Sequence, residues 1–230
     1  MPRKTIIILG AGLSGLTAAL ELAKNGYSVM VCDKRTDSGV RFHNDYQGIE
    51  NWSGRTDAII EIQRMGIVPN FDCYPFTHVS FSDGRSVSRL ETRRPLYYLV
   101  RRGTEEGTLD QSLKKQAELA GVKINYNCEI TEAEVDINAT GPRKRSNVEG
   151  YKYPGVAKGV VFETNSPDQA LLIFNDDMAY RGYSYLLIAR GHGTLQSVVL
   201  GDLRRVHYGL ELTLDYVENK IGVDIQNPQA

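Results

Sequence analysis

The pattern of apolar and polar positions near the N-terminus predicts a strand, a helix and a second strand. Residues 5–9 form a short apolar run rich in isoleucine, which is typical of a buried strand. Apolar residues then recur at helical spacing over residues 13–25, and Gly26 follows as a helix end that tolerates a left-handed backbone. Residues 27–33 alternate as a strand does. Together these segments predict a βαβ unit of a parallel sheet.

The middle of the chain gives a weaker signal. Residues 34–100 are irregular, with scattered turn residues and short strands such as residues 78–81. A second helix is expected from Leu109 to Gly121, because Thr108 fits the first position of a capping box. We expect strands at residues 122–130 and 135–139 after it.

The pattern changes after about residue 150. Turn residues there separate short apolar runs, which predicts an antiparallel sheet. The expected strands lie at residues 159–164, 170–175 and 183–189. A final helix over residues 206–221 carries one apolar face. The fold class is therefore α/β, with a nucleotide-binding domain over residues 1–150 and a sheet-rich lobe over residues 151–230.

The strongest motif is the glycine pattern between the first strand and the first helix. Gly10 permits a tight turn, Gly12 leaves room for a pyrophosphate, and Gly15 lets the helix pack close to the sheet. The start of that helix offers N–H groups and a partial positive charge to phosphates. Asp33 ends the second strand, where a carboxylate can bind ribose hydroxyls. The full context predicts a dinucleotide site.

Composition and charge narrow the range of functions. The chain has 230 residues, and its 27 Lys+Arg against 28 Asp+Glu give a net charge of −1. A nucleic-acid-binding protein usually carries a basic surplus, so we expect no nucleic acid. The three cysteines, Cys32, Cys73 and Cys128, form no CxxC motif, which fits a reducing, cytoplasmic location and predicts no metal site.

Two features favour FAD over NAD as the dinucleotide. Arg101 and Arg102 precede the second helix, where an arginine can reach a pyrophosphate bound on the first helix. Residues 135–142 then form a short strand that ends in small residues, so that the backbone can pass beside a cofactor.

With these motifs, the sequence resembles the FAD-dependent oxidoreductases of the glutathione-reductase and p-hydroxybenzoate-hydroxylase type. Within them it looks most like the geranylgeranyl reductase group, on the strength of residues 182–188 and the glycines at Gly191 and Gly193. The resemblance implies a Rossmann-type FAD-binding domain (GR2 type) with an antiparallel substrate lobe. It also implies hydride transfer between flavin and an apolar, prenyl-like substrate, with NAD(P)H or a protein as electron donor.

The predicted site has a cofactor part and a substrate part. The cofactor part comprises Gly10, Ala11, Gly12, Ser14, Gly15, Asp33, Lys34, Arg41, Arg102, Ile130, Ala139, Thr140 and Gly141. The substrate part comprises Tyr183, Tyr185, Gly191 and Gly193. No residue can be named as a catalytic acid or base.

The sequence also departs from the family pattern. Tyr185 and Ile188 stand where the family has Trp and Pro, and Gly201-Asp202 is followed by residues too bulky to cover a flavin. We therefore expect a fragment or a reduced family member that holds FAD weakly. The apolar face of the final helix is expected to need a partner from outside the chain.

Three functions stay open at this stage. They are a flavin reductase or dehydrogenase, a flavin monooxygenase or halogenase, and a truncated relative that binds nucleotide without turnover. The basic triplet at residues 143–145 could also touch anionic lipid heads, which allows peripheral membrane contact. The oligomeric state cannot be predicted.

Overall fold

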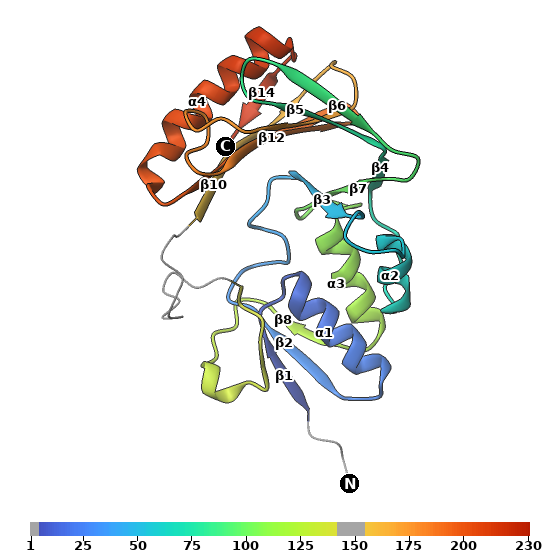
Figure 1. Cartoon of the computed structure of the whole chain (residues 1–230). Helices are drawn as coiled ribbons and strands as arrows, with labels where there is room; N and C mark the ends of the chain where they lie inside the picture. The colour runs from blue at the N-terminus through green and yellow to red at the C-terminus, as the bar shows by residue number, and fades with distance from the viewer. Residues whose placement is uncertain (1–4, 142–154) are drawn as a thin grey trace. The chain divides into compact units, whose positions relative to one another are not determined.

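The computed structural model describes residues 5–141 and 155–230, and the chain divides into two compact units that interleave along the sequence (Figure 1). Within the described ranges, unit 1 holds residues 5–44, 53–73 and 100–141, and unit 2 holds residues 45–52, 74–99 and 155–230. This division differs from the single boundary near residue 150 that the sequence suggests. The reason is that segments of the irregular middle region form strands of the second unit. The basic triplet at residues 143–145 lies outside the described residues.

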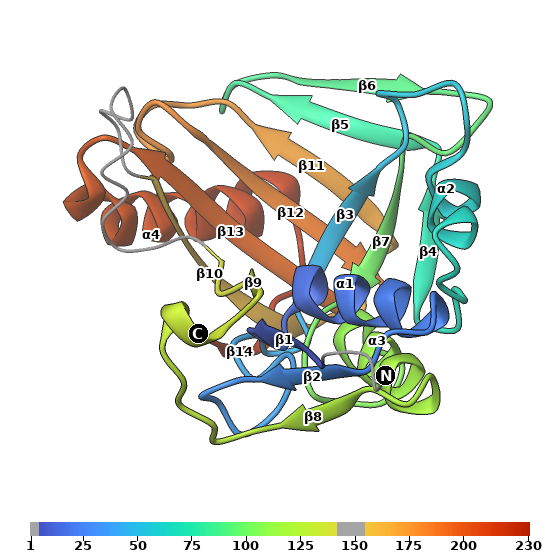
Figure 2. The same cartoon turned by 90° about the horizontal axis from the view of Figure 1, so that it is seen from below.

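Unit 1 contains a parallel sheet with the strand order β8-β2-β1-β9. Its strands are β1 (Ile6–Leu9), β2 (Val29–Cys32), β8 (Lys123–Asn125) and β9 (Ile137–Asn138), and its helices are α1 (Leu13–Lys24), α2 (Ala58–Arg64) and α3 (Leu109–Leu119). Figure 2 shows β1, β2 and β8 side by side with α1 next to them. The predicted βαβ unit and the α/β fold class are confirmed. Strands β8 and β9 are shorter than the expected residues 122–130 and 135–139.

Local sequence signals explain the ends of the long helices in unit 1. Gly26, after α1, and Gly121, after α3, both have a left-handed backbone, with φ of 79° and 87°. At the start of α3, the Thr108 hydroxyl accepts a hydrogen bond from the Gln111 amide nitrogen at 3.4 Å. The Gln111 side chain instead donates to the Ser38 carbonyl at 2.9 Å, so the reciprocal half of the expected capping box is replaced by a tertiary contact.

Unit 2 is built around a sheet with the order β14-β10-β13-β12-β11-β5-β6 (Figure 2). Its strands are β5 (His78–Ser82), β6 (Val87–Glu91), β10 (Gly155–Glu163), β11 (Gln169–Ile173), β12 (Tyr183–Ala189), β13 (His192–Leu200) and β14 (Gln226–Gln229). A smaller sheet has the order β3-β7-β4, from β3 (Tyr46–Glu50), β7 (Tyr97–Arg101) and β4 (Cys73–Phe76). The large sheet is antiparallel except where β11 pairs with β5 in parallel. The predicted antiparallel lobe is thus present, with one parallel pairing that the sequence did not indicate.

The final helix, α4 (Val206–Tyr216), continues as a wider turn over Val217–Ile221 and lies along one face of the large sheet (Figure 1). Tyr216 and Val217 are buried together with Leu186 and Leu195 of the sheet. The expectation that this helix needs a partner from outside the chain is therefore wrong. The sheet is wider than predicted, because β13 had not been anticipated, and it covers the apolar face itself.

Candidate functional site

The glycine loop after β1 has the close packing that a dinucleotide-binding turn requires. Gly10 has a φ of 108°, and a Cβ atom there would lie 2.6 Å from the carbonyl oxygen of Ala139. A Cβ atom on Gly15 would overlap the carbonyl oxygen of Gly10. These two glycines therefore bring the loop, helix α1 and the end of β9 together, as predicted from the motif.

Gly12 has a different environment. No atom of the described residues lies within 4 Å of the position that a Cβ atom would take there. Gly12 is the N-cap of α1, and within the described ranges no side chain caps this helix and no acidic residue lies in its first turn. The first N–H groups of α1 therefore have no side-chain cap, and open space lies beside them at Gly12. This cradle fits a phosphate or pyrophosphate group.

Asp33 connects the end of β2 to the glycine loop. Its Oδ2 atom accepts a hydrogen bond from the Ala11 amide at 2.7 Å, and its Oδ1 atom accepts one from the Arg35 amide at 2.8 Å. Each carboxylate oxygen can accept a further hydrogen bond. Asp33 therefore orients the loop and still has acceptor capacity for a ribose, so the residues present fit a dinucleotide.

A hydrogen-bonded group that sequence analysis missed supports the same loop. The buried Ser38 hydroxyl lies 2.7 Å from the Ala11 carbonyl oxygen, to which it donates, and 2.7 Å from the Tyr126 hydroxyl. Asp37 precedes Ser38 in the chain, and its Oδ1 atom accepts a hydrogen bond from Lys114 Nζ at 2.7 Å. These contacts join residues 27 to 88 positions apart, so no local pattern could have indicated them.

Arg102, a predicted pyrophosphate contact, is held by an ion pair within unit 1. Its Nε and Nη2 atoms donate to the two carboxylate oxygens of Asp110 at 2.8 and 2.9 Å, and its guanidinium lies 4.0 Å from the centre of the Phe42 ring. Asp110 is on α3 and is 1% exposed. Arg102 therefore anchors the start of α3. Its contact with a pyrophosphate stays a prediction.

The remaining predicted cofactor residues differ in how far their side chains are exposed to solvent. Lys34, Arg41, Thr140 and Gly141 are exposed, whereas Ile130 and Ala139 are half-buried. The Thr140 hydroxyl donates to Asn138 Oδ1 at 2.8 Å, and the Ala139 amide donates to the Leu9 carbonyl at 2.8 Å. Ser14 is exposed in the first turn of α1. Ala139 and Thr140 lie beside Gly10 and thus close to the cradle, whereas roles for the others stay predictions.

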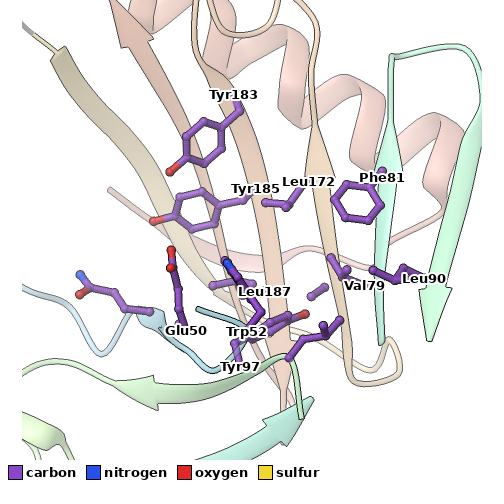
Figure 3. Close-up of a pocket in the computed structure, with 14 residues that line it drawn as sticks. Glu50, Trp52, Val79, Phe81, Leu90, Tyr97, Leu172, Tyr183, Tyr185 and Leu187 are labelled. Carbon is purple, nitrogen blue, oxygen red and sulfur yellow. The ribbon is translucent and has the colours of Figure 1, made fainter. Parts of the chain in front are cut away.

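Unit 2 contains a cavity of about 470 Å³ between its two sheets (Figure 3). Apolar and aromatic side chains make up most of its wall, and its size falls in the usual range for small-molecule sites. The lining residues are Gln47, Gly48, Glu50, Trp52, Val79, Phe81, Leu90, Leu96, Tyr97, Ala170, Leu172, Tyr183, Tyr185 and Leu187. Nine of these fourteen lie outside the predicted lobe of residues 151–230, and of the five within it only Tyr183 and Tyr185 are predicted substrate residues.

Tyr183 and Tyr185 lie on one side of β12 and both line this cavity, with ring centroids 6.2 Å apart (Figure 3). The Tyr185 hydroxyl donates to Gln196 Oε1 at 2.7 Å. Burial, and to a smaller extent the charge of Asp45, raises the pKa of Tyr185, so this phenol stays protonated at neutral pH.

The two predicted substrate glycines lie elsewhere. Gly191 has a φ of 79° in the turn between β12 and β13, and a Cβ atom on Gly193 would overlap the Phe162 ring. Both glycines therefore serve the hairpin and the packing of the sheet, and neither is among the described residues that line the cavity.

The described residues contain no group of three or more His, Cys, Asp or Glu side chains that could hold a metal ion. Within the same ranges, no helix has both the length and the apolar character needed to cross a membrane.

Comparison with known proteins agrees with this architecture. Residues 8–51 match the family model of an NAD(P)-binding Rossmann-like domain. No curated protein sequence matches the chain.

Solved structures extend the likeness to both units. A 2-methyl-3-hydroxypyridine-5-carboxylic acid oxygenase is 16% identical with a TM-score of 0.61, over 99% of this chain and 69% of that one. The p-nitrophenol 4-monooxygenase of Pseudomonas putida is 14% identical with a TM-score of 0.62, over 98% of this chain and 68% of that one. The flavin-dependent halogenase CmlS is 12% identical with a TM-score of 0.61, over 100% of this chain and 49% of that one. The chain thus has the fold of FAD-dependent monooxygenases and halogenases.

Proposed function

We propose that the protein is a FAD-dependent oxidoreductase of the monooxygenase type, which acts on a small apolar or aromatic compound. The observation that carries this proposal is the pairing of a nucleotide cradle in one unit with an apolar cavity in the other, within a fold whose relatives are oxygenases and halogenases.

The cofactor would be held mainly by unit 1. The N–H groups at the start of α1 would bind its pyrophosphate, Gly12 would leave room for the phosphate oxygens, and Asp33 would bind its ribose. When bound, a flavin supplies the two-electron chemistry that side chains lack, and NAD(P)H or a protein would reduce it.

The substrate would occupy the cavity of unit 2. Its apolar wall favours a flat ring, and Trp52 meets Tyr97 edge to face with ring centroids 6.4 Å apart. Gln47 and Glu50 add an amide and a carboxylate, which could orient a hydroxyl substituent. The substrates in the names of two relatives, a hydroxypyridine carboxylic acid and a nitrophenol, are rings of this kind.

A second candidate is the reduction of an isolated C=C bond in a prenyl-like compound. The observation in its favour is the predominance of apolar side chains around the cavity. The structural relatives favour oxygenation instead, so this reading ranks second.

Dependence on molecular oxygen separates the two candidates. The FAD-loaded protein would be mixed with NAD(P)H and a panel of hydroxylated aromatic acids, nitrophenols and prenyl diphosphates, with and without oxygen. We expect an aromatic compound to stimulate oxygen uptake and to yield a hydroxylated product. Anaerobic saturation of a prenyl double bond would support the reductase instead, and turnover of neither class would contradict both.

A further inference from the structure

Two cysteines that are far apart in the sequence meet in unit 1. The Sγ atoms of Cys32 and Cys128 lie 2.7 Å apart, although 96 positions separate the residues in the chain. Both are free thiols. Cys32 is the last residue of β2 and is 1% exposed, whereas Cys128 follows β8 and is half-buried.

Backbone hydrogen bonds fix the segments that carry the two thiols. The Asp33 amide donates to the Asn125 carbonyl at 2.9 Å, and the Cys128 amide donates back to the Asp33 carbonyl at 3.0 Å. The Asn127 amide donates to the Arg35 carbonyl at 2.9 Å, and Asn127 has a φ of 50°. The left-handed residue turns the chain so that Cys128 points back at the end of β2. The two thiols are therefore held in place by the backbone and do not meet by chance on mobile side chains.

The two thiols differ in burial, and this difference determines which of them reacts first. Burial, followed by the hydrogen bond from Cys128, raises the pKa of Cys32 to about 11. Cys32 is thus protonated at neutral pH and shielded from solvent. Cys128 is the more accessible sulfur and would react first with a dissolved oxidant.

We propose that Cys32 and Cys128 are a reversible dithiol–disulfide site, oxidised by small-molecule disulfides of the glutathione class. In the first step, the Cys128 thiolate attacks the small disulfide, forms a mixed disulfide and releases one small thiol. In the second step, the Cys32 sulfur, having lost its proton, attacks the Cys128 sulfur and releases the second small thiol. The two protein thiols lose two electrons and two protons, and the small disulfide gains them.

A Cys32–Cys128 disulfide would close a chain loop over residues 32–128, next to the nucleotide cradle. Asp33, which orients the glycine loop, directly follows Cys32. Closing a loop of this length restricts the unfolded chain and stabilises the folded one. We expect the oxidised protein to melt at a higher temperature, with a rise on the order of 5 °C or more.

The test is a titration of the folded protein with mixtures of reduced and oxidised glutathione. We expect the three titratable thiols to fall to one, with a loss of two hydrogen atoms in mass and a Cys32–Cys128 linkage in the non-reduced peptide map. Dithiothreitol should restore all the thiols and the lower melting temperature. Three thiols at every ratio would overturn the proposal, and so would a bond between two chains.

Matched variants separate the pair from general thiol oxidation. Cys73→Ser alters the third cysteine, on β4, and should leave the linkage and the melting shift unchanged. Cys128→Ser leaves the buried Cys32 in place and should abolish both. A glutathione adduct that persists on Cys128 in the parent protein, without transfer to Cys32, would contradict the second step.

Discussion

Gly12 and Gly15 have different surroundings, so the same substitution made at each position separates an effect on binding from an effect on folding. Replacing either glycine by alanine adds a single methyl group, three residues apart in the same loop and helix. At Gly15 the methyl group would overlap the Gly10 carbonyl oxygen and lie 3.3 Å from the Ala139 Cβ atom. At Gly12 it would enter space where no described atom lies within 4 Å.

The expected magnitudes follow from these distances. Gly15→Ala should destabilise the protein by about 1–3 kcal/mol, because the helix must move away from the sheet. Gly12→Ala should cost about 1 kcal/mol or less, the difference between two N-cap residues. If a phosphate occupies the open space at Gly12, the methyl group would displace it from the helix N–H groups. The loss of one charged hydrogen bond, about 1.5–3 kcal/mol, would weaken ADP binding at least about tenfold.

The assay combines thermal unfolding with calorimetric titration of ADP, the part of FAD that the cradle would hold. We expect Gly15→Ala to lower the melting temperature and Gly12→Ala to lower the ADP affinity of a protein that remains folded. Gly12→Val should lower the affinity further. Wild-type ADP affinity in Gly12→Val would refute the placement of the phosphate.

Three other substitutions test the remaining contacts. Asp110→Ala should destabilise the protein by about 3–5 kcal/mol in denaturant unfolding, because Arg102 is left buried without its carboxylate; unfolding at wild-type denaturant concentration would contradict that role. Burial alone would raise the pKa of Asp37, but hydrogen bonds from Lys114 and nearby groups lower it overall. The resulting stabilisation, about 1 kcal/mol or less, should therefore be present at neutral pH and be lost as the pH falls below about 4. Asp37→Asn should flatten that part of the pH–stability curve, and an unchanged acid limb would argue against the pair. Tyr185→Phe should raise the KM for an aromatic substrate several-fold while flavin content stays constant, and a parallel loss of flavin would indicate a packing role instead.

The sequence could predict the elements whose contacts are local. The βαβ unit, the Thr108 N-cap of α3 and the strand at residues 183–189 all follow from periodicity and cap residues, and the structure confirms them. The roles of Gly10 and Gly15 were also accessible, because the motif reflects a fixed backbone geometry.

Contacts between distant segments could not be predicted. The sequence predicts that Arg102 binds a phosphate, whereas its ion pair with Asp110 becomes visible only in the folded structure. The strand at His192–Leu200 is absent from the predicted elements, and the structure shows that Gly193 within it makes room for Phe162. The predicted substrate residues all lie in the C-terminal lobe, yet nine of the fourteen residues that line the cavity come from residues 47–97, whose irregular pattern conceals their strands.

The most direct test of the proposed function is a titration of the nucleotide-free protein with FAD, followed by flavin fluorescence and the visible spectrum. The proposal predicts one FAD per chain, displaced by ADP and lost in Gly12→Val, with NAD⁺ bound more weakly. Tight binding of NAD⁺ without any binding of FAD would contradict it.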